Sequence, residues 1–298
     1  MIIPLPERRA LEYAHSINQT TFALLVTLDP DLKEQLFLAE EPRLSPLLEE
    51  AFVKGLKPLS YVQFTDGHHS RIEAHAERQA VARLLTLDII YCDEAIVVVN
   101  KPVALHAIPG KGSHKQDSVT SRLKAIFTPN LANPAVHRLD YDTSGLMVLA
   151  LTKESQSALA VQFAKRTVYK KYVALVEGEV GEEQGEITLA FRYDSGHKPR
   201  QKYDPVLGKW GETKWHRLAL ETYQGRRVSR LELIPLTGRT HQLRLHTSHP
   251  KGLGAPIVGD TLYGTAQKAE RLMLHACTLA FRHPLTDELI EFYEIPPF

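Results

Sequence analysis

The sequence has little of several features that would narrow its class at once. Its 298 residues contain two cysteines, Cys92 and Cys277, which are too few for a disulfide framework or a four-thiolate metal site. No stretch approaches the roughly 20 apolar residues that span a bilayer. The N-terminal residues have no charged start followed by an apolar core, and there is no internal repeat or low-complexity tract. We therefore expect a cytoplasmic globular protein with reduced thiols and no membrane partner.

The charge of the chain is balanced overall but unevenly distributed. The formal net charge is +1, yet residues 1–88 contain 9 Lys and Arg against 13 Asp and Glu, a net charge of −4. Residues 89–298 contain 27 Lys and Arg against 22 Asp and Glu, a net charge of +5. A mildly basic body is compatible with a nucleic-acid partner. A chance fluctuation among surface charges explains the same numbers equally well.

The pattern of apolar residues predicts an N-terminal extension, residues 1–87, and a larger domain, residues 88–298. The extension contains one strand-like run, Thr20–Leu28, and an amphipathic helix over His68–Leu87. It contains no recognisable basic RNA-binding module, and we assign it no function beyond packing.

The larger domain is mostly strand-like. Its expected strands are Ala95–Asn100, Gly145–Thr152, Tyr169–Glu177, Thr213–Thr222, Arg227–Pro235, Leu272–Arg282 and Leu289–Glu294. Its expected helices are Asp117–Phe127, Glu154–Lys165 and His241–Thr247. Many strands without regular alternation of strand and helix predict an α+β fold with a mostly antiparallel mixed sheet and flanking helices.

Three polar clusters interrupt these apolar elements. The first is His137–Gly145, in which carboxylates and an arginine precede an apolar run. The second is Tyr169–Ala174, where Lys170 and Tyr172 share one face of a strand and can grip phosphate and stack on a base. The third is Leu236–His246, which carries arginines suited to charge-assisted pairing with a carboxylate. Each cluster alone also fits a structural role, as a capped turn, a half-buried strand or an exposed basic helix.

Taken together and in order, the clusters resemble the RluA-type RNA pseudouridine synthases. The segments that carry this resemblance are V-V-N-K-P at Val98–Pro102, HRLD-x-x-TSG at His137–Gly145, K-x-Y at Lys170–Tyr172, TGRTHQLRLH at Thr237–His246, GD-x-x-YG at Gly259–Gly264 and LHA-x-x-L-x-F-x-HP at Leu274–Pro284. The resemblance covers about residues 88–298 and does not extend to the N-terminal extension. Many members of that family carry a basic N-terminal RNA-binding module that is not recognisable here.

The resemblance implies an isomerase that breaks the N-glycosidic bond of a uridine and rejoins the uracil through carbon 5, without a cofactor or metal. It implies that Asp140 is the catalytic nucleophile, that Arg244 pairs with Asp140, and that Tyr172 packs against the target base. It also implies that Arg138 enters the RNA stack where the uridine leaves, because a stacked base must be flipped out before chemistry can reach it.

The expected partner is structured RNA, an rRNA or tRNA stem-loop, and the protein is expected to be a monomer. The residues expected to contact RNA are His137, Arg138, Thr143, Lys165, Arg166, Lys170, Arg239, Thr240 and His241. Lys198, Arg200 and Lys202 are further candidates for phosphate contacts, although a solvated surface explains each of them singly.

Three alternatives are open to test. Asp140-Tyr141-Asp142 imitates the start of an aspartate-nucleophile phosphatase of the haloacid dehalogenase type, which would need Mg²⁺ and a parallel sheet. A non-catalytic RNA-binding module with a vestigial site is the second. A metal site built from His241, His246 and His249 is weaker than either, because their spacing brings only the last two near one another; satisfied or surface histidines explain them better.

Overall fold

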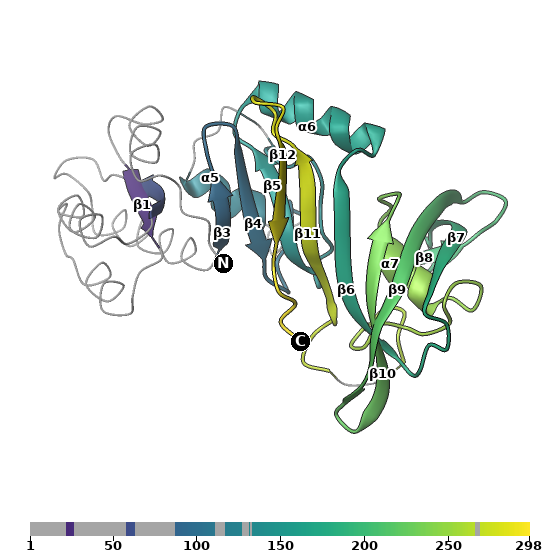
Figure 1. Cartoon of the computed structure of the whole chain (residues 1–298). Coiled ribbons are helices and arrows are strands. Elements are labelled where there is room, and N and C mark those ends of the chain that lie inside the picture. Colours follow the sequence, from purple (N-terminus) through teal and green to yellow (C-terminus); the bar gives the residue numbers. More distant parts are fainter. Residues whose placement is uncertain are drawn as a thin grey trace. The chain divides into compact units, whose positions relative to one another are not determined.

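The structure of the protein, a computed structural model shown in Figure 1, describes residues 22–26, 58–62, 87–110, 117–126, 131, 133–265 and 269–298. These residues form two compact units, which we describe one at a time. Among them, no helix is both long and apolar enough to cross a membrane. The helix expected over His68–Leu87 lies outside the described residues, and the division at residues 87 and 88 stays a prediction.

The first unit comprises the described residues within Met1–Lys101, His106–Arg138 and Met147–Ala160. Its paired strands are β1 (Phe22–Val26) with β2 (Pro58–Val62), and β3 (Asp88–Cys92) with β4 (Ile96–Lys101), both antiparallel. Its helices are α5 (Val119–Ile126) and the first part of α6 (Lys153–Lys165), and the second half of β5 (Ser144–Ala150) lies next to β4. The apolar run in β4 is completely buried, as a continuous apolar strand requires.

The second unit comprises Pro102–Leu105, Leu139–Leu146 and the described residues within Val161–Phe298. Its remaining elements are β6 (Tyr169–Glu177), β7 (Gln184–Tyr193), β8 (Gln201–Tyr203), β9 (Lys209–Tyr223), β10 (Arg226–Pro235), α7 (Gln242–Ser248), β11 (Leu274–Arg282) and β12 (Leu289–Tyr293). Its strands run in the order β5, β11, β6, β10, β9, β7, β8, and β12 pairs with β11. The pairing of β11 with β5 is parallel, and the other registered pairings in this unit are antiparallel.

The core of the second unit forms where the apolar residues of these strands meet α7. Leu231 and Leu233 of β10 alternate with less buried residues and belong to the same buried cluster as Leu243 and Leu245 of α7. Helix α7 packs against β7 and β9, and it lies beside them in Figure 1. The packing therefore buries residues 242–247 of α7, polar and apolar alike, against the sheet.

The predicted α+β class with a mostly antiparallel mixed sheet is confirmed. The strand predicted over Tyr169–Glu177 matches β6 at both ends, and the other predicted strands and helices of the larger domain are present with ends shifted by a few residues. Strands β3, β7 and β8 were not predicted. In β7 the first three residues are exposed, and burial becomes continuous only over residues 189–191.

Gly145 determines how β5 joins the sheet of the second unit. Its φ angle is +116°, and a Cβ at this position would lie 2.3 Å from the carbonyl oxygen of Ala276 in β11. Gly145 and Ala276 are direct partners in the parallel pairing. A glycine is therefore needed here for two reasons, the backbone conformation and the close approach of the neighbouring strand. This explains why a glycine ends the HRLD-x-x-TSG segment.

Replacing Gly145 with Ala is expected to lower the free energy of unfolding by about 4 kcal/mol or more, because strain and backbone overlap add up. The matched control is Gly225→Ala in the turn between β9 and β10. Gly225 also has a positive φ, +76°, but no atom lies within 4 Å of the added Cβ. This control should cost only about 1–2 kcal/mol. Equal costs in urea-unfolding measurements would contradict the assigned close approach.

Candidate active site

The segment Leu139–Leu146 places two carboxylates in a tight turn at the start of β5. The amide of Thr143 donates to the carbonyl of Asp140 at 3.2 Å, which closes the turn. The side chain of Asp140 is 17% exposed, and that of Asp142 is 39% exposed. Asp140 is therefore the carboxylate that is more withdrawn from water, as a reactive carboxylate would be.

A buried glutamine anchors the start of α7. The side-chain oxygen of Gln242 accepts from the Thr237 hydroxyl at 2.7 Å and from the Arg239 amide at 3.1 Å. Its amide nitrogen donates to the carbonyl of Glu212 and to the hydroxyl of Thr213 in β9. The hydrogen bonds of Gln242 thus join the TGRTHQ segment to itself and to β9, and they hold the first turn of α7 against the sheet.

Arg244 of α7 is bound to Asp260, a residue to which sequence reasoning gave no role. Its Nε and Nη2 donate to the two carboxylate oxygens of Asp260 at 2.8 and 2.6 Å, and both side chains are buried. Nη1 lies 4.0 Å from Oδ2 of Asp142. The pair of Arg244 with Asp140 stays a prediction, and the side of the guanidinium formed by Nε and Nη2 is occupied by Asp260.

Asp140 still acts on Arg244 through its charge. Burial lowers the pKa of the Arg244 guanidinium, but the hydrogen bonds and charge of Asp260 and the charges of Asp140 and Asp142 outweigh it, so the pKa is raised. Arg244 is therefore a permanent cation surrounded by three carboxylates, of which it contacts one directly.

The GD-x-x-YG turn adds a tyrosine to the site. Oδ1 of Asp260 accepts from the amides of Leu262 and Tyr263 at 2.9 and 3.0 Å, so the same carboxylate shapes the turn and holds Arg244. The guanidinium carbons of Arg244 and Arg200 each lie 5.6 Å from the centre of the Tyr263 ring. The GD-x-x-YG motif was recognised in the sequence. The fold determines which side chains Asp260 and Tyr263 contact.

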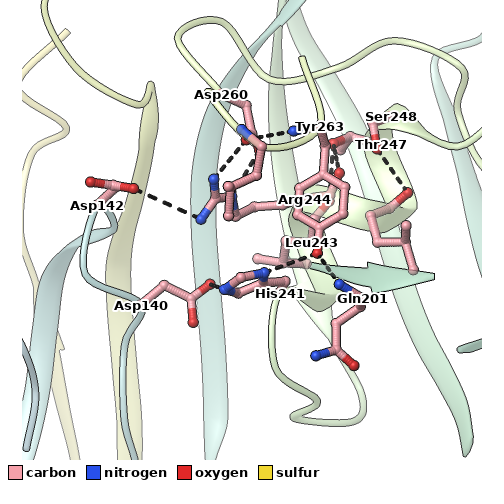
Figure 2. A network of polar contacts seen from close by, with 12 residues as sticks. Asp140, Asp142, Gln201, His241, Leu243, Arg244, Thr247, Ser248, Asp260 and Tyr263 are labelled. Atoms are coloured by element: carbon pink, nitrogen blue, oxygen red, sulfur yellow. Dashed lines mark hydrogen bonds and ion pairs between the residues drawn. The ribbon is translucent and has the colours of Figure 1, made fainter. Parts of the chain in front are cut away.

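His241 lies between Tyr263 and Asp140, as Figure 2 shows. Its Nδ1 is 2.9 Å from the Tyr263 hydroxyl, and its Nε2 is 4.0 Å from Oδ2 of Asp140. The side chain is 9% exposed. The residue was predicted to contact RNA, whereas its ring is turned toward the carboxylate inside the site.

Strand β6 contributes Tyr172 and Lys170 to this unit. Burial raises the pKa of the Tyr172 phenol well above its ordinary value, with smaller contributions from the charge of Asp140 and from Cys277. Tyr172 is therefore a neutral phenol within electrostatic range of Asp140. Burial lowers the pKa of the Lys170 amine, and a Cβ at Gly238 would lie 3.8 Å from its Nζ, which places the amine beside the turn before α7.

The other predicted RNA contacts are placed in several ways. Arg239 and Thr240 are exposed beside α7, and Lys165 and Arg166 are exposed at the end of α6. Thr143 is 2% exposed, and its RNA contact stays a prediction.

His137 and Arg138 belong to the first unit. Nε2 of His137 accepts from the amide of Val148 in β5, so this ring holds its own segment to the strand. Arg138 is exposed. The RNA contacts predicted for these two residues stay predictions.

The histidines of α7 serve the core and the surface. His246 is completely buried edge-on against the Phe191 ring, its ring nitrogens have no hydrogen-bond partner among the described residues, and burial lowers its pKa to about 4. It is not the satisfied histidine that the sequence led us to expect, but a neutral ring used for packing. Nδ1 of His249 accepts from the amide of Lys251, and its ring lies against Tyr203.

Comparisons with known proteins identify the family of the chain. The RNA pseudouridylate synthase family matches residues 95–249. The dual-specificity RNA pseudouridine synthase RluA of Pasteurella multocida is 43% identical over 71% of this chain and 94% of its own length. RluA of Escherichia coli strain K12 is 38% identical over 66% of this chain and 88% of its own length.

Solved structures show the same relationship. Human RNA Pseudouridylate Synthase Domain Containing 1 is 31% identical with a TM-score of 0.60, over 72% of this chain and 85% of that one. Human RNA Pseudouridylate Synthase Domain Containing 4 is 26% identical with a TM-score of 0.54, over 76% of this chain and 94% of that one. Both are similar in fold and in sequence to the part of the chain that carries the site. The chain therefore belongs to the RNA pseudouridine synthase family, in its RluA type.

Proposed function

We propose that this isomerase converts specific uridines to pseudouridine in both rRNA and tRNA, and that Asp140 is its nucleophile. The proposal depends most on one observation, the half-buried Asp140 carboxylate that lies within electrostatic range of both Tyr172 and Arg244. Dual specificity is carried over from the relatives, which are named for it. The remaining catalytic roles follow from the chemistry of the reaction.

The reaction breaks the bond between N1 of uracil and C1′ of ribose and forms one between C5 and C1′. The hydrogen on C5 leaves as a proton and N1 gains one, so the RNA keeps its composition. An ionised carboxylate can attack the sugar or the base and later leave, and Asp140 is suited to this role. Arg244 places a positive charge within electrostatic range of that carboxylate, and the neutral Tyr172 phenol offers a flat ring and a hydroxyl to a flipped uracil.

Lys170 is proposed to bind a phosphate of the flipped nucleotide. Its amine is half-buried next to the turn before α7 and makes no ion pair with any residue in the described part of the chain. A lysine that is partly withdrawn from water without a carboxylate partner is costly unless an anion arrives. An RNA phosphate is the anion that this family's substrate provides.

Replacing Lys170 with Met is expected to weaken RNA binding and to reduce the slope of log affinity against log salt by about 0.7, the contribution of one phosphate contact to a single strand. Lys171→Met is the matched control on the next residue of β6, because the Lys171 amine already pairs with Glu232 at 2.8 Å. Fluorescence titrations of a uridine-containing stem-loop at several salt concentrations measure both slopes. Equal changes in the two variants would contradict the assignment.

The test of the proposed function is pseudouridine mapping of rRNA and tRNA from cells with and without the gene. Sites that disappear in both RNA classes, and that return with the intact gene, support dual specificity. Loss from only one class would limit the enzyme to that class. Unchanged maps, together with no isomerisation of either RNA by the purified protein, would overturn the proposal. The expected monomer in the cytoplasm is checked by sedimentation and by fractionation.

A further inference from the structure

We propose that His241 is a positioning residue for Asp140, and that Tyr263 holds its ring in the tautomer whose Nε2–H points at the Asp140 carboxylate. This inference rests on the proposed role of Asp140 as the nucleophile. It assigns a role within the site to His241, which the sequence analysis expected to contact RNA, and to Tyr263, which had no assigned role. Three observations carry it: the hydrogen bonds of Tyr263, the position of Nε2, and the backbone of His241.

The hydrogen bonds of the Tyr263 hydroxyl determine the tautomer. The amide of Gln201 in β8 donates to this oxygen at 2.6 Å. The other partner of the hydroxyl within the described ranges is Nδ1 of His241, at 2.9 Å. A phenol has one proton to donate, and it satisfies that proton here only by giving it to Nδ1. Nδ1 is then the acceptor, and the ring proton is on Nε2.

The position of Nε2 directs that proton toward the catalytic carboxylate. Nε2 lies 4.0 Å from Oδ2 of Asp140 on the opposite side of the ring from Tyr263, as the dashed lines in Figure 2 show. This distance is too long for a hydrogen bond. In enzymes without substrate, such contacts are commonly long and shorten when the substrate complex forms. A donor there orients one carboxylate oxygen and leaves the other for reaction.

The backbone of His241 is held in a conformation that its local sequence does not favour. Its φ and ψ are +55° and +20°, in the left-handed region, and it precedes α7 without a side-chain cap. A non-glycine residue in this region costs about 1–2 kcal/mol. A cap residue such as Ser or Asn would stabilise this helix end, whereas His241 uses its side chain to link Tyr263 with Asp140. The strained backbone of His241 thus occurs together with an imidazole ring that points from Tyr263 toward Asp140.

Tyr263 is itself held from several sides, which makes it a firm support. The guanidinium carbons of Arg200 and Arg244 each lie 5.6 Å from the centre of its ring, and its turn is closed by Asp260. The His241 ring meets it nearly at right angles, with 5.7 Å between centres. A catalytic group keeps its reactive geometry within about half an ångström when the residue that orients it is itself fixed by packing and hydrogen bonds.

Two isosteric substitutions of His241 separate the two ring nitrogens. His241→Gln can place an amide N–H near the position of Nε2, whereas His241→Asn reaches only the position of Nδ1. We expect His241→Asn to lower the single-turnover rate by about 100-fold, as a misplaced reactive group does, and His241→Gln to lower it by about tenfold or less. RNA affinity should change less than about threefold in both, because neither variant removes a phosphate contact.

The measurement is release of the C5 hydrogen as tritium from a stem-loop labelled at that position, with the full chain in excess over RNA. His216→Asn, an exposed histidine on β9, is the control for loss of an imidazole. Equal rates for the Asn and Gln variants, or a loss confined to RNA affinity, would overturn the positioning role and would leave His241 as an RNA contact. A folded state is verified for each variant by thermal melting.

Tyr263→Phe tests the same role without touching His241. It removes the proton donor to Nδ1 but keeps the ring, so the rate should fall by about tenfold. In the His241→Gln background, which has no Nδ1, the same change should have no further effect on the rate. Tyr293→Phe, at an exposed position of β12, is the matched control. Additive losses from Tyr263→Phe and His241→Gln would overturn the proposed link.

Failure of this inference is distinguishable from failure of the proposed function. If the unaltered chain releases no tritium from either RNA class, the proposed function fails first and His241 is not at issue. If the unaltered chain is active and Asp140→Asn is inactive, the nucleophile stands. The rates of the His241 and Tyr263 variants then decide the positioning role alone.

Discussion

Replacing Asp140 with Asn is expected to reduce the single-turnover rate of uridine isomerisation by at least about 10³-fold, which corresponds to about 4 kcal/mol of lost transition-state stabilisation. The amide has the shape of the carboxylate but neither its charge nor its nucleophilicity, so no covalent step can begin. The side chain is only 17% exposed, and water cannot readily replace it as the attacking group.

Binding of RNA should survive this substitution, because phosphate contacts and not the nucleophile supply most of the affinity. The dissociation constant for the stem-loop should stay within about threefold or become smaller, since a buried negative charge facing RNA has been removed. Asp142→Asn is the matched control, two residues further along the same turn and 39% exposed. A larger loss of rate for Asp142→Asn than for Asp140→Asn would assign the nucleophile to Asp142 instead.

The sequence predicted the members of this site better than it predicted their partners. Asp140, Tyr172 and Arg244 come from three separate motifs, and Tyr172 and Arg244 each lie within electrostatic range of Asp140. The ion pairs between these residues could not be predicted in the same way. A motif shows which residues are present, but it does not show which carboxylate an arginine contacts. Arg244 has three carboxylates around it, and only the tertiary packing of the Asp260 turn selects its direct partner.

The same limit applies to the fold. Strand β6 was predicted at both ends because its apolar half is continuous and its polar half carries a motif. Strand β7 was missed because its first half is polar and exposed, so its place in the sheet comes from pairing with β9 and not from its own apolar pattern. The left-handed backbone at His241 likewise has no signal in the sequence, since residues other than glycine adopt it uncommonly.

Replacing Arg244 with Met is expected to lower the free energy of unfolding by about 3–5 kcal/mol, because it leaves the Asp260 carboxylate buried without its counter-charge. The Asp260 side chain is 0% exposed, and its remaining donors are the backbone amides of Leu262 and Tyr263. Methionine has nearly the length of arginine and leaves little empty space, so the cost comes from the charge. Urea unfolding followed by circular dichroism measures it.

The control for this stability effect is an arginine pair at the surface. Arg282 and Asp287 lie 3.7 Å apart with side chains that are 60% and 84% exposed. Arg282→Met should change the free energy of unfolding by less than about 1 kcal/mol, since exposed pairs contribute little. A cost for Arg244→Met as small as this control would show that Asp260 is not stabilised through Arg244.

The double variant Arg244→Met with Asp260→Asn separates the structural role of Arg244 from its catalytic one. Removing both charges should recover at least about 2 kcal/mol relative to Arg244→Met alone, because no uncompensated carboxylate remains. The neutral amide oxygen can still accept from the amides of Leu262 and Tyr263. Any loss of isomerisation rate that persists in this restabilised protein then measures the effect of the Arg244 charge on Asp140, which Arg244 does not contact directly. A double variant with near-normal rate would make Arg244 a scaffold residue and leave Asp140 to be supported by other groups.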